Sequence, residues 1–118
     1  MTDIYKTKVF NRWSEKEGLT DTALCNAIDE VDDGKIEASL GVYLFKKRVA
    51  RPGQGKSGSY RTIIALKREE KAFFLFGFAK GSRCNISDKE EKALKKLSKH
   101  FMGCTNKELE RAVENGAL

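Results

Sequence analysis

Residues 60–79 read YRTIIALKREEKAFFLFGFA, and this stretch decides the fold. Residues 60–67 and 71–79 are rich in β-branched and aromatic side chains, so each favours a strand. The three residues between them, 68–70, leave room only for a short connection, which predicts an antiparallel hairpin. Because residues 71–79 are apolar almost throughout, the second strand should be central and covered on both faces.

Further strands are expected before this hairpin. Residues 38–50, ASLGVYLFKKRVA, predict strand structure with a break near Gly41. Residues 4–10, IYKTKVF, alternate polar residues with β-branched and aromatic ones and predict a short strand. The hairpin should therefore belong to a sheet of about four to five strands.

Two helices are expected between these strands. Asn11 can cap a first helix that ends at Gly18, and Thr20 can cap a second that ends at Gly34. The second helix carries an apolar stripe at helical spacing, formed by Ala23, Leu24, Ala27, Ile28 and Val31.

Two more helices should close the chain. SDKE (87–90) and TNKE (105–108) both have the spacing of a capping box, and Gly103 and Gly116 supply the stops. The resulting order predicts an α+β fold, in which a mainly antiparallel sheet carries two N-terminal helices and the C-terminal helices. We expect one domain over residues 1–118, with a core over about 5–102 and a helical extension over about 103–118.

Composition excludes several classes of protein. A chain of 118 residues that is 40% hydrophobic with one proline is not typical of disorder. No apolar run approaches the roughly 20 residues of a membrane span, and the N-terminus lacks a signal-peptide pattern. Three distant cysteines fit neither a disulfide framework nor a zinc site, which favours a reducing, cytoplasmic setting.

The net charge of +6 is unevenly distributed. Residues 1–43 carry a net charge of −4, whereas residues 44–83 contain 11 Lys and Arg against 2 Asp and Glu, a net charge of +9. A strongly basic segment in a compact domain indicates a polyanionic partner, most often a nucleic acid.

The glycine-rich stretch ARPGQGKSGS (50–59) comes close to a P-loop motif. A P-loop lies between a strand and a helix, however, and here a strand is expected directly after it. We therefore interpret residues 50–59 as a loop that brings cations close to the sheet, with glycines that permit close approach to a phosphate chain.

Any catalytic chemistry should come from the Lys and Arg residues of the basic segment, residues 44–83. The single histidine, His100, lies late in a helix, and no metal-ligand set or paired carboxylates accompany it. RNA carries its own nucleophile, the 2′-hydroxyl, so cations that orient it and neutralise the phosphorane suffice for cleavage. A lysine crowded by other cations has a lowered pKa and can act as a base. Either Tyr60 or Phe78 could stack on an unpaired base.

The strings KKRVARPGQGKSGSYRT (46–62) and FFLFGFAKGSRCNIS (73–87) resemble the RelE/ParE superfamily of bacterial toxins, and look closest to its HigB-like branch. The resemblance covers roughly residues 5–102. It implies the toxin of a type II toxin–antitoxin system, a ribosome-dependent mRNA endonuclease that needs no cofactor. It also implies a cytoplasmic protein whose partners are the ribosome, mRNA and an antitoxin, expected to be a small helix-turn-helix protein.

The resemblance also suggests site residues. Arg61 matches the arginine that stabilises the scissile phosphate, and Lys80 or Arg83 matches the basic position after the following strand. The expected catalytic set is Lys56, Arg61, Lys80 and Arg83, and the expected substrate-binding set is Lys46, Lys47, Arg48, Arg51, Tyr60 and Phe78. The C-terminal catalytic tyrosine of some relatives has no counterpart here, because Asn85 and Ser87 occupy that region.

Two other functions stay open. A ParE-like gyrase inhibitor would share the fold but act on DNA supercoiling. A non-enzymatic relative would bind RNA in a salt-dependent way without cutting it.

Overall fold

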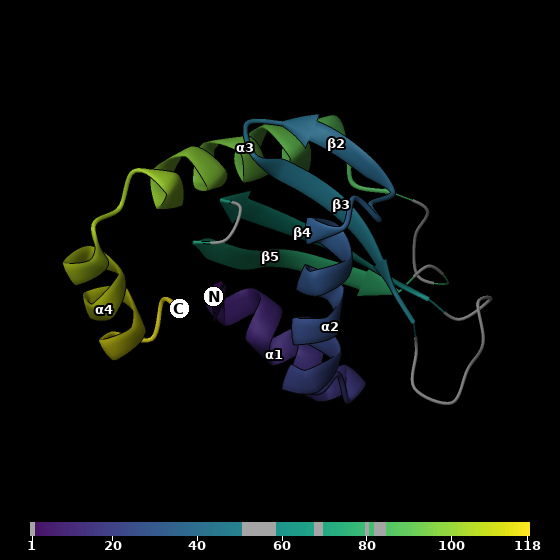
Figure 1. Ribbon diagram of the computed structural model, residues 1–118, viewed down its shortest axis with the longest axis horizontal. Coiled ribbons are helices and arrows are strands. Elements are labelled where there is room, and N and C mark those ends of the chain that lie inside the picture. The colour runs from purple at the N-terminus through teal and green to yellow at the C-terminus, as the bar shows by residue number, and fades with distance from the viewer. Residues whose placement is uncertain (1, 51–58, 68–69, 80, 82–84) are drawn as a thin grey trace.

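The computed structural model describes residues 2–50, 59–67, 70–79, 81 and 85–118 (Figure 1). Nine elements follow one another in these ranges: β1 (Asp3–Lys6), α1 (Lys8–Glu17), α2 (Asp21–Asp32), β2 (Ala38–Gly41), β3 (Leu44–Val49), β4 (Tyr60–Lys67), β5 (Lys71–Ala79), α3 (Asp88–Met102) and α4 (Asn106–Glu114).

The strands form one five-stranded sheet in the order β1-β5-β4-β3-β2. β1 runs parallel to β5, and the other neighbours are antiparallel. The α+β fold with a mainly antiparallel sheet is thereby confirmed, and so is the hairpin of β4 and β5 at its centre.

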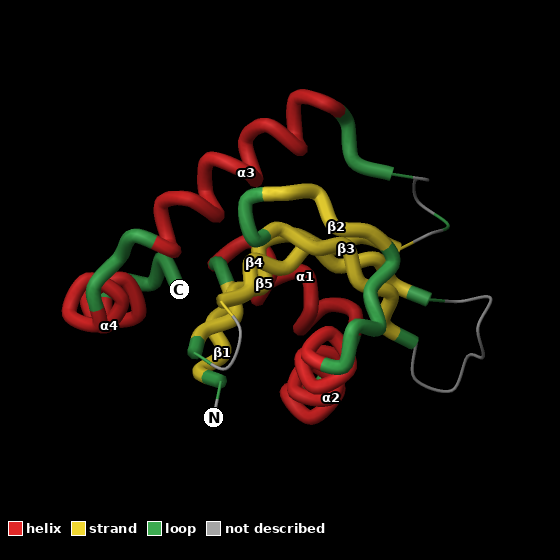
Figure 2. The backbone as a smooth tube through the Cα atoms, turned by 45° about the horizontal axis from the view of Figure 1, so that its top comes forward, coloured by secondary structure: helices red, strands yellow, loops and turns green. Residues whose placement is uncertain are grey.

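Helices cover both faces of the sheet, as Figure 2 shows. On one face, α1 and α2 pack against a cluster that includes Phe10, Ile28, Tyr60 and Phe74. On the other face, α3 and α4 pack against a cluster of Leu44, Ile63, Ala65, Phe73, Leu75, Leu94, Phe101 and Leu109. Strands β4 and β5 are buried on both faces because the two clusters share them.

The N-terminal strand is shorter than the sequence predicted. We expected a strand over residues 4–10 and a helix capped by Asn11, but β1 ends at Lys6 and α1 begins at Lys8. The reason is Thr7, whose hydroxyl accepts the amide hydrogen of Phe10 and donates to the carbonyl of Leu75. One threonine thus both ends the strand and caps the helix. Gly18 ends α1 as predicted, with φ of 76°.

The other predicted boundaries agree with the structure. Thr20 caps α2, whose apolar stripe packs into the core, and Gly34 follows its end with φ of 84°. The break near Gly41 is a tight turn between β2 and β3. Both capping boxes are present, Ser87 with Glu90 and Thr105 with Glu108.

The C-terminal residues pack against the N-terminal ones. Leu109 of α4 is fully buried in the cluster beneath α3. The amide of Lys8 donates to the carbonyl of Ala117 at 3.2 Å, and both chain ends lie on the same side of the molecule in Figure 1.

Candidate active site

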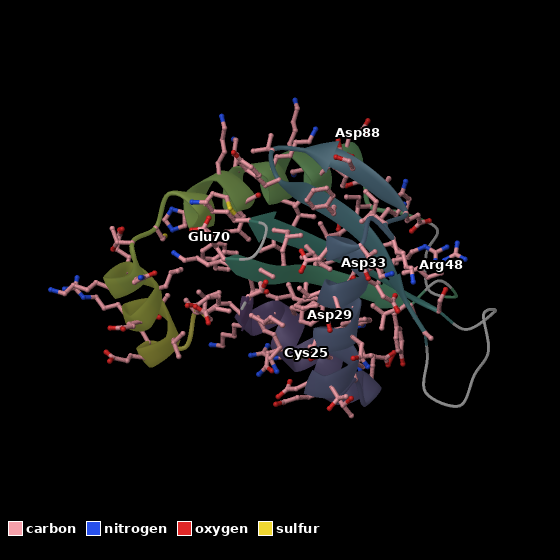
Figure 3. All side chains as sticks on the ribbon, in the orientation of Figure 1. Cys25, Asp29, Asp33, Arg48, Glu70 and Asp88 are labelled. Carbon is pink, nitrogen blue, oxygen red and sulfur yellow. The ribbon has the colours of Figure 1, made fainter. Side chains whose placement is uncertain are left out.

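The sheet face that packs against α3 changes from apolar to basic along its length. On β3 the residues of this face are Leu44, Lys46 and Arg48, which run from fully buried to exposed. Figure 3 shows Arg48 at one end of the sheet and Glu70, in the β4–β5 turn, at the other. The cations of this face therefore gather at the sheet end farthest from that turn.

Strand register aligns the basic residues in rows across the sheet. The end row consists of Arg48, Arg61 and Phe78, on β3, β4 and β5. The row beside it consists of Lys46, Ile63 and Phe76. Three residues that the sequence singled out thus share one row, and Lys46 lies in the next. We call Lys46, Arg48 and Arg61 the basic face.

Arg61 is held rigidly within this face. Its Nε lies 3.0 Å from Glu37 Oε2, and its Nη1 donates to Ser59 Oγ at 2.9 Å. The Arg61 side chain is only 7% exposed. These partners use two of the five N–H groups of Arg61.

Arg48 supplies a second cation directly opposite Arg61. Like charges on cross-strand neighbours repel each other and destabilise the sheet. Arg48 is exposed and forms no ion pair with the described residues, whereas Glu37 balances Arg61. An anion that bridges the two guanidinium groups would relieve this repulsion, and their planar forks match the geometry of a phosphate.

Lys46 connects the basic face to the start of α3. Its Nζ donates to the side-chain oxygen of Asn85 at 2.8 Å, and the same oxygen accepts the amide hydrogen of Ile86. Because Asn85 is neutral, this contact positions the ammonium group and leaves its charge uncompensated. Asn85 lies two residues before the capping serine of α3, so the contact joins β3 to the segment that leads into this helix.

Lys47 lies on the opposite face of the sheet. Its Nζ is 2.6 Å from Glu30 Oε1 on α2 and donates to the carbonyl of Lys35 at 2.9 Å. The hydrogen bond and charge of Lys47 lower the pKa of Glu30 below its ordinary value. The ion pair joins α2 to β3, so the structure places Lys47 apart from Lys46, Arg48 and Arg61.

The two aromatic residues expected to stack on a base are both buried. Tyr60 is 2% exposed, and its hydroxyl donates to the carbonyl of Glu17 in the α1–α2 core. Phe78 is 4% exposed, although it shares a row with Arg61. Phe76, one row away on the same sheet face, is half-buried.

Four expected site residues, Arg51, Lys56, Lys80 and Arg83, lie outside the described residues. Most of the glycine-rich stretch 50–59 does as well. The element that follows this stretch is strand β4, paired antiparallel to β3 and β5. A P-loop would be followed by a helix, so the P-loop interpretation is not supported.

Glu37, Ser59 and Phe76 were missed by the sequence reasoning. Glu37 lies 24 residues before Arg61 and meets it only because β2, β3 and β4 are neighbours. No local pattern signals such a pair. The period of two along β5 could have identified Phe76, since it shares a face with Phe78.

The sequence matches a known protein family over almost its whole length. The family model that describes the RelE toxin of the RelE/RelB toxin–antitoxin system matches residues 2–118. The chain belongs to the RelE toxin family. Membership in this family implies a cognate antitoxin as partner. No curated protein matches the chain.

The RelE family match agrees with the fold derived above. The match covers residues 2–118, which include α4 as well as the sheet. Among the described residues, no helix combines the length and apolar character needed to cross a bilayer.

Proposed function

We propose that the protein is a ribosome-dependent mRNA endonuclease of the HigB-like branch of these toxins. The observation that carries the proposal is the opposed pair Arg48 and Arg61, with Arg61 fixed by Glu37 and Ser59. Toxins of the RelE family are generally RNases, which supports the same reaction class.

The basic face suits the transition state of RNA cleavage. Attack of the 2′-hydroxyl on the adjacent phosphorus gives a phosphorane that carries more negative charge than the phosphodiester. Arg61 is preorganised, because two of its N–H groups are already bonded to protein, so it needs little reorganisation as this charge develops. An anion approaching this face meets the exposed Arg48 first.

Proton transfer requires a base for the 2′-hydroxyl and an acid for the leaving 5′-oxygen. We propose that Lys56 is a candidate base. Lys80 or Arg83 would be the general acid or a further phosphate contact, beside the contact of Arg61 with the scissile phosphate. Lys46, Arg48 and Arg51 would hold the flanking phosphates. Lys47 would act through the stability of the α2–β3 contact, because its ammonium group is bonded to Glu30 on the other face.

The partners follow from the proposed reaction. Ribosomes and mRNA place the protein in the cytoplasm. We propose a small helix-turn-helix antitoxin with an acidic segment, because such a segment complements the net charge of +9 of residues 44–83.

The proposed function is tested by mapping mRNA 5′ ends after brief expression of the protein, and by incubating purified protein with mRNA in the presence and absence of ribosomes. We expect new 5′ ends within translated regions and cleavage only when ribosomes are present. A supercoiling assay with purified gyrase is run in parallel, and we expect no inhibition.

Arg48→Gln and Arg12→Gln are the matched pair for this experiment, since both remove one exposed arginine. Arg48→Gln should slow cleavage strongly, whereas Arg12→Gln on α1 should not. The proposal is refuted if gyrase is inhibited while mRNA stays intact. Binding to ribosomes without any cleavage would identify a non-enzymatic relative instead.

A further inference from the structure

Helix α3 carries a second cluster of positive charge outside the basic face. Lys89, Lys92, Lys96 and Lys99 are separated by three, four and three residues and are all exposed. At 3.6 residues per turn they fall within an arc of about 80°. The opposite side of the helix carries Leu94, Ser98 and Phe101, which are buried. We call these four residues the α3 lysine stripe.

The lysines of the α3 lysine stripe are not paired with acids among the residues that the structure describes, although Asp88 lies four residues before Lys92. None of its four residues forms an ion pair within the described part of the chain, although α3 does form one on its flank, between Glu91 and Lys95. Neighbouring lysines three or four residues apart repel each other and destabilise a helix. Surfaces that serve solubility alone usually mix both signs of charge. A one-sign stripe is instead suited to an anionic partner.

The α3 lysine stripe is rigid and begins close to the basic face. The capping box of Ser87 and Glu90 fixes the first turn of α3, and Gly103 caps its end. Lys46 of the basic face is bonded to Asn85, four residues before Lys89. From Lys89 to Lys99 the helix advances about 15 Å, at 1.5 Å per residue. The stripe therefore starts near the basic face and leads away from it along α3.

We propose that the α3 lysine stripe is a docking surface for the phosphate backbone of folded RNA. This inference rests on the proposed function. The stripe would hold the toxin on folded RNA while the basic face cleaves mRNA. Lysines act as point charges on phosphates and carry no base-specific information, so the contact would be independent of sequence.

The composition of the stripe favours RNA over an acidic protein. Protein interfaces rely on buried aromatic and apolar anchors. The exposed large hydrophobic residues among the described residues are Val9, Val42, Tyr43 and Val113, and none lies on α3. A partner that contacts the lysine stripe itself would thus gain charge contacts but no large apolar anchor, as a phosphate backbone does.

The test compares two variants with the same change of net charge. In the first, Lys89, Lys92, Lys96 and Lys99 are all replaced by Gln. In the control, four exposed cations elsewhere are replaced by Gln: Arg12, Lys16, Lys107 and Arg111. Binding is measured at several salt concentrations, both to ribosomes that carry an mRNA with 2′-deoxynucleotides and to a mixed-sequence RNA duplex.

We expect the stripe variant to bind both RNAs at least tenfold more weakly at low salt. Each lost phosphate contact reduces the dependence of log affinity on log salt by about 0.9, so the slope should shrink by about three to four. The control should keep most of the affinity and slope. Both variants should retain the circular dichroism spectrum and melting temperature of the unchanged protein.

Equal binding by the stripe variant and the control would overturn the inference, as would a stripe variant that keeps RNA binding and loses binding to the cognate antitoxin. These failures are distinct from failure of the proposed function. A protein that cuts ribosome-bound mRNA without using the stripe refutes only the stripe. A protein that binds RNA through the stripe but never cuts refutes only the nuclease.

Discussion

At the scale of single residues, the orientation of the Arg61 side chain is set by the residues that it contacts. Glu37 and Ser59 fix two of its N–H groups and leave the rest of the guanidinium in one orientation. Glu37 is 27% exposed at its side chain, so it can be replaced without leaving a fully buried gap. Glu37 is therefore a positioning residue in the proposed site.

Glu37→Ala should slow mRNA cleavage about 10- to 100-fold, because a catalytic group displaced by about 1 Å can lose that much rate. Glu37→Gln, which retains an acceptor for Arg61 Nε, should recover part of the loss. Single-turnover cleavage on ribosomes measures both. Glu15→Gln, on the exposed side of α1, serves as the control, and equal rates for all three variants would refute the positioning role.

Glu30 and Lys47 should make stability depend on pH. Since the pKa of Glu30 is lowered in the folded protein, the ion pair stabilises the fold above the unfolded pKa, about 4.3. That contribution is lost as the pH falls through the lower folded pKa. Glu30→Gln should cost about 1 kcal/mol at pH 7, a modest value because the Glu30 side chain is 49% exposed.

Urea denaturation at pH 7 and at about pH 3 measures this dependence. The difference between the unchanged protein and Glu30→Gln should shrink at the lower pH, whereas Asp29→Asn, one position earlier on α2, should show little difference at pH 7. A difference that grows as the pH falls would contradict the assigned ion pair.

At the scale of elements, the sequence predicted what local patterns control. Alternation and apolar runs identified β3, β4 and β5, and the capping boxes located α3 and α4 because both partners lie within four residues. The predicted start of α1 was wrong. Thr7 can end a strand or cap a helix, and its hydrogen bond to the carbonyl of Leu75 determines that it does both. That partner is 68 residues away, beyond the reach of any local pattern.

Gly77 shows how closely α1 packs on β5. A Cβ at this position would overlap the indole ring of Trp13, 2.6 Å from its Cε3. Gly77→Ala should lower the free energy of unfolding by about 1 to 3 kcal/mol, because the ring cannot move without disturbing Phe10 and Tyr60. Gly103→Ala, whose Cβ would meet only ordinary contacts, should change it little. Similar melting temperatures for the two variants would contradict this packing.

At the scale of the whole molecule, charge and burial are arranged by faces. The count of +9 over residues 44–83 indicated a polyanionic partner, but it could not separate Lys47, bonded to Glu30, from Lys46, Arg48 and Arg61 on the other face. Alternation along a strand gives that separation only when the strand's boundaries and its covered faces are known. The residues of the basic face could thus be predicted from the sequence, but their arrangement on one face of the sheet could not.

The C-terminal helix should be required for stability. Leu109 is 0% exposed and belongs to the cluster beneath α3, whereas Val113 on the same helix is 49% exposed. Leu109→Ala should cost about 2 to 5 kcal/mol, and Val113→Ala less than about 0.5 kcal/mol. Thermal unfolding followed by circular dichroism distinguishes them, and equal costs would show that α4 does not pack as described.

The central claim is that Arg61 stabilises the scissile phosphate of ribosome-bound mRNA, and single-turnover cleavage by Arg61→Lys and Arg61→Ala tests it most directly. Because Arg61 is buried, each variant is first checked for an intact fold by its circular dichroism spectrum and by antitoxin binding. We predict that both folded variants bind programmed ribosomes but cut at least 100-fold more slowly, the loss typical of removing one transition-state donor. A folded Arg61→Ala protein that cuts at the rate of the unchanged protein would contradict the account.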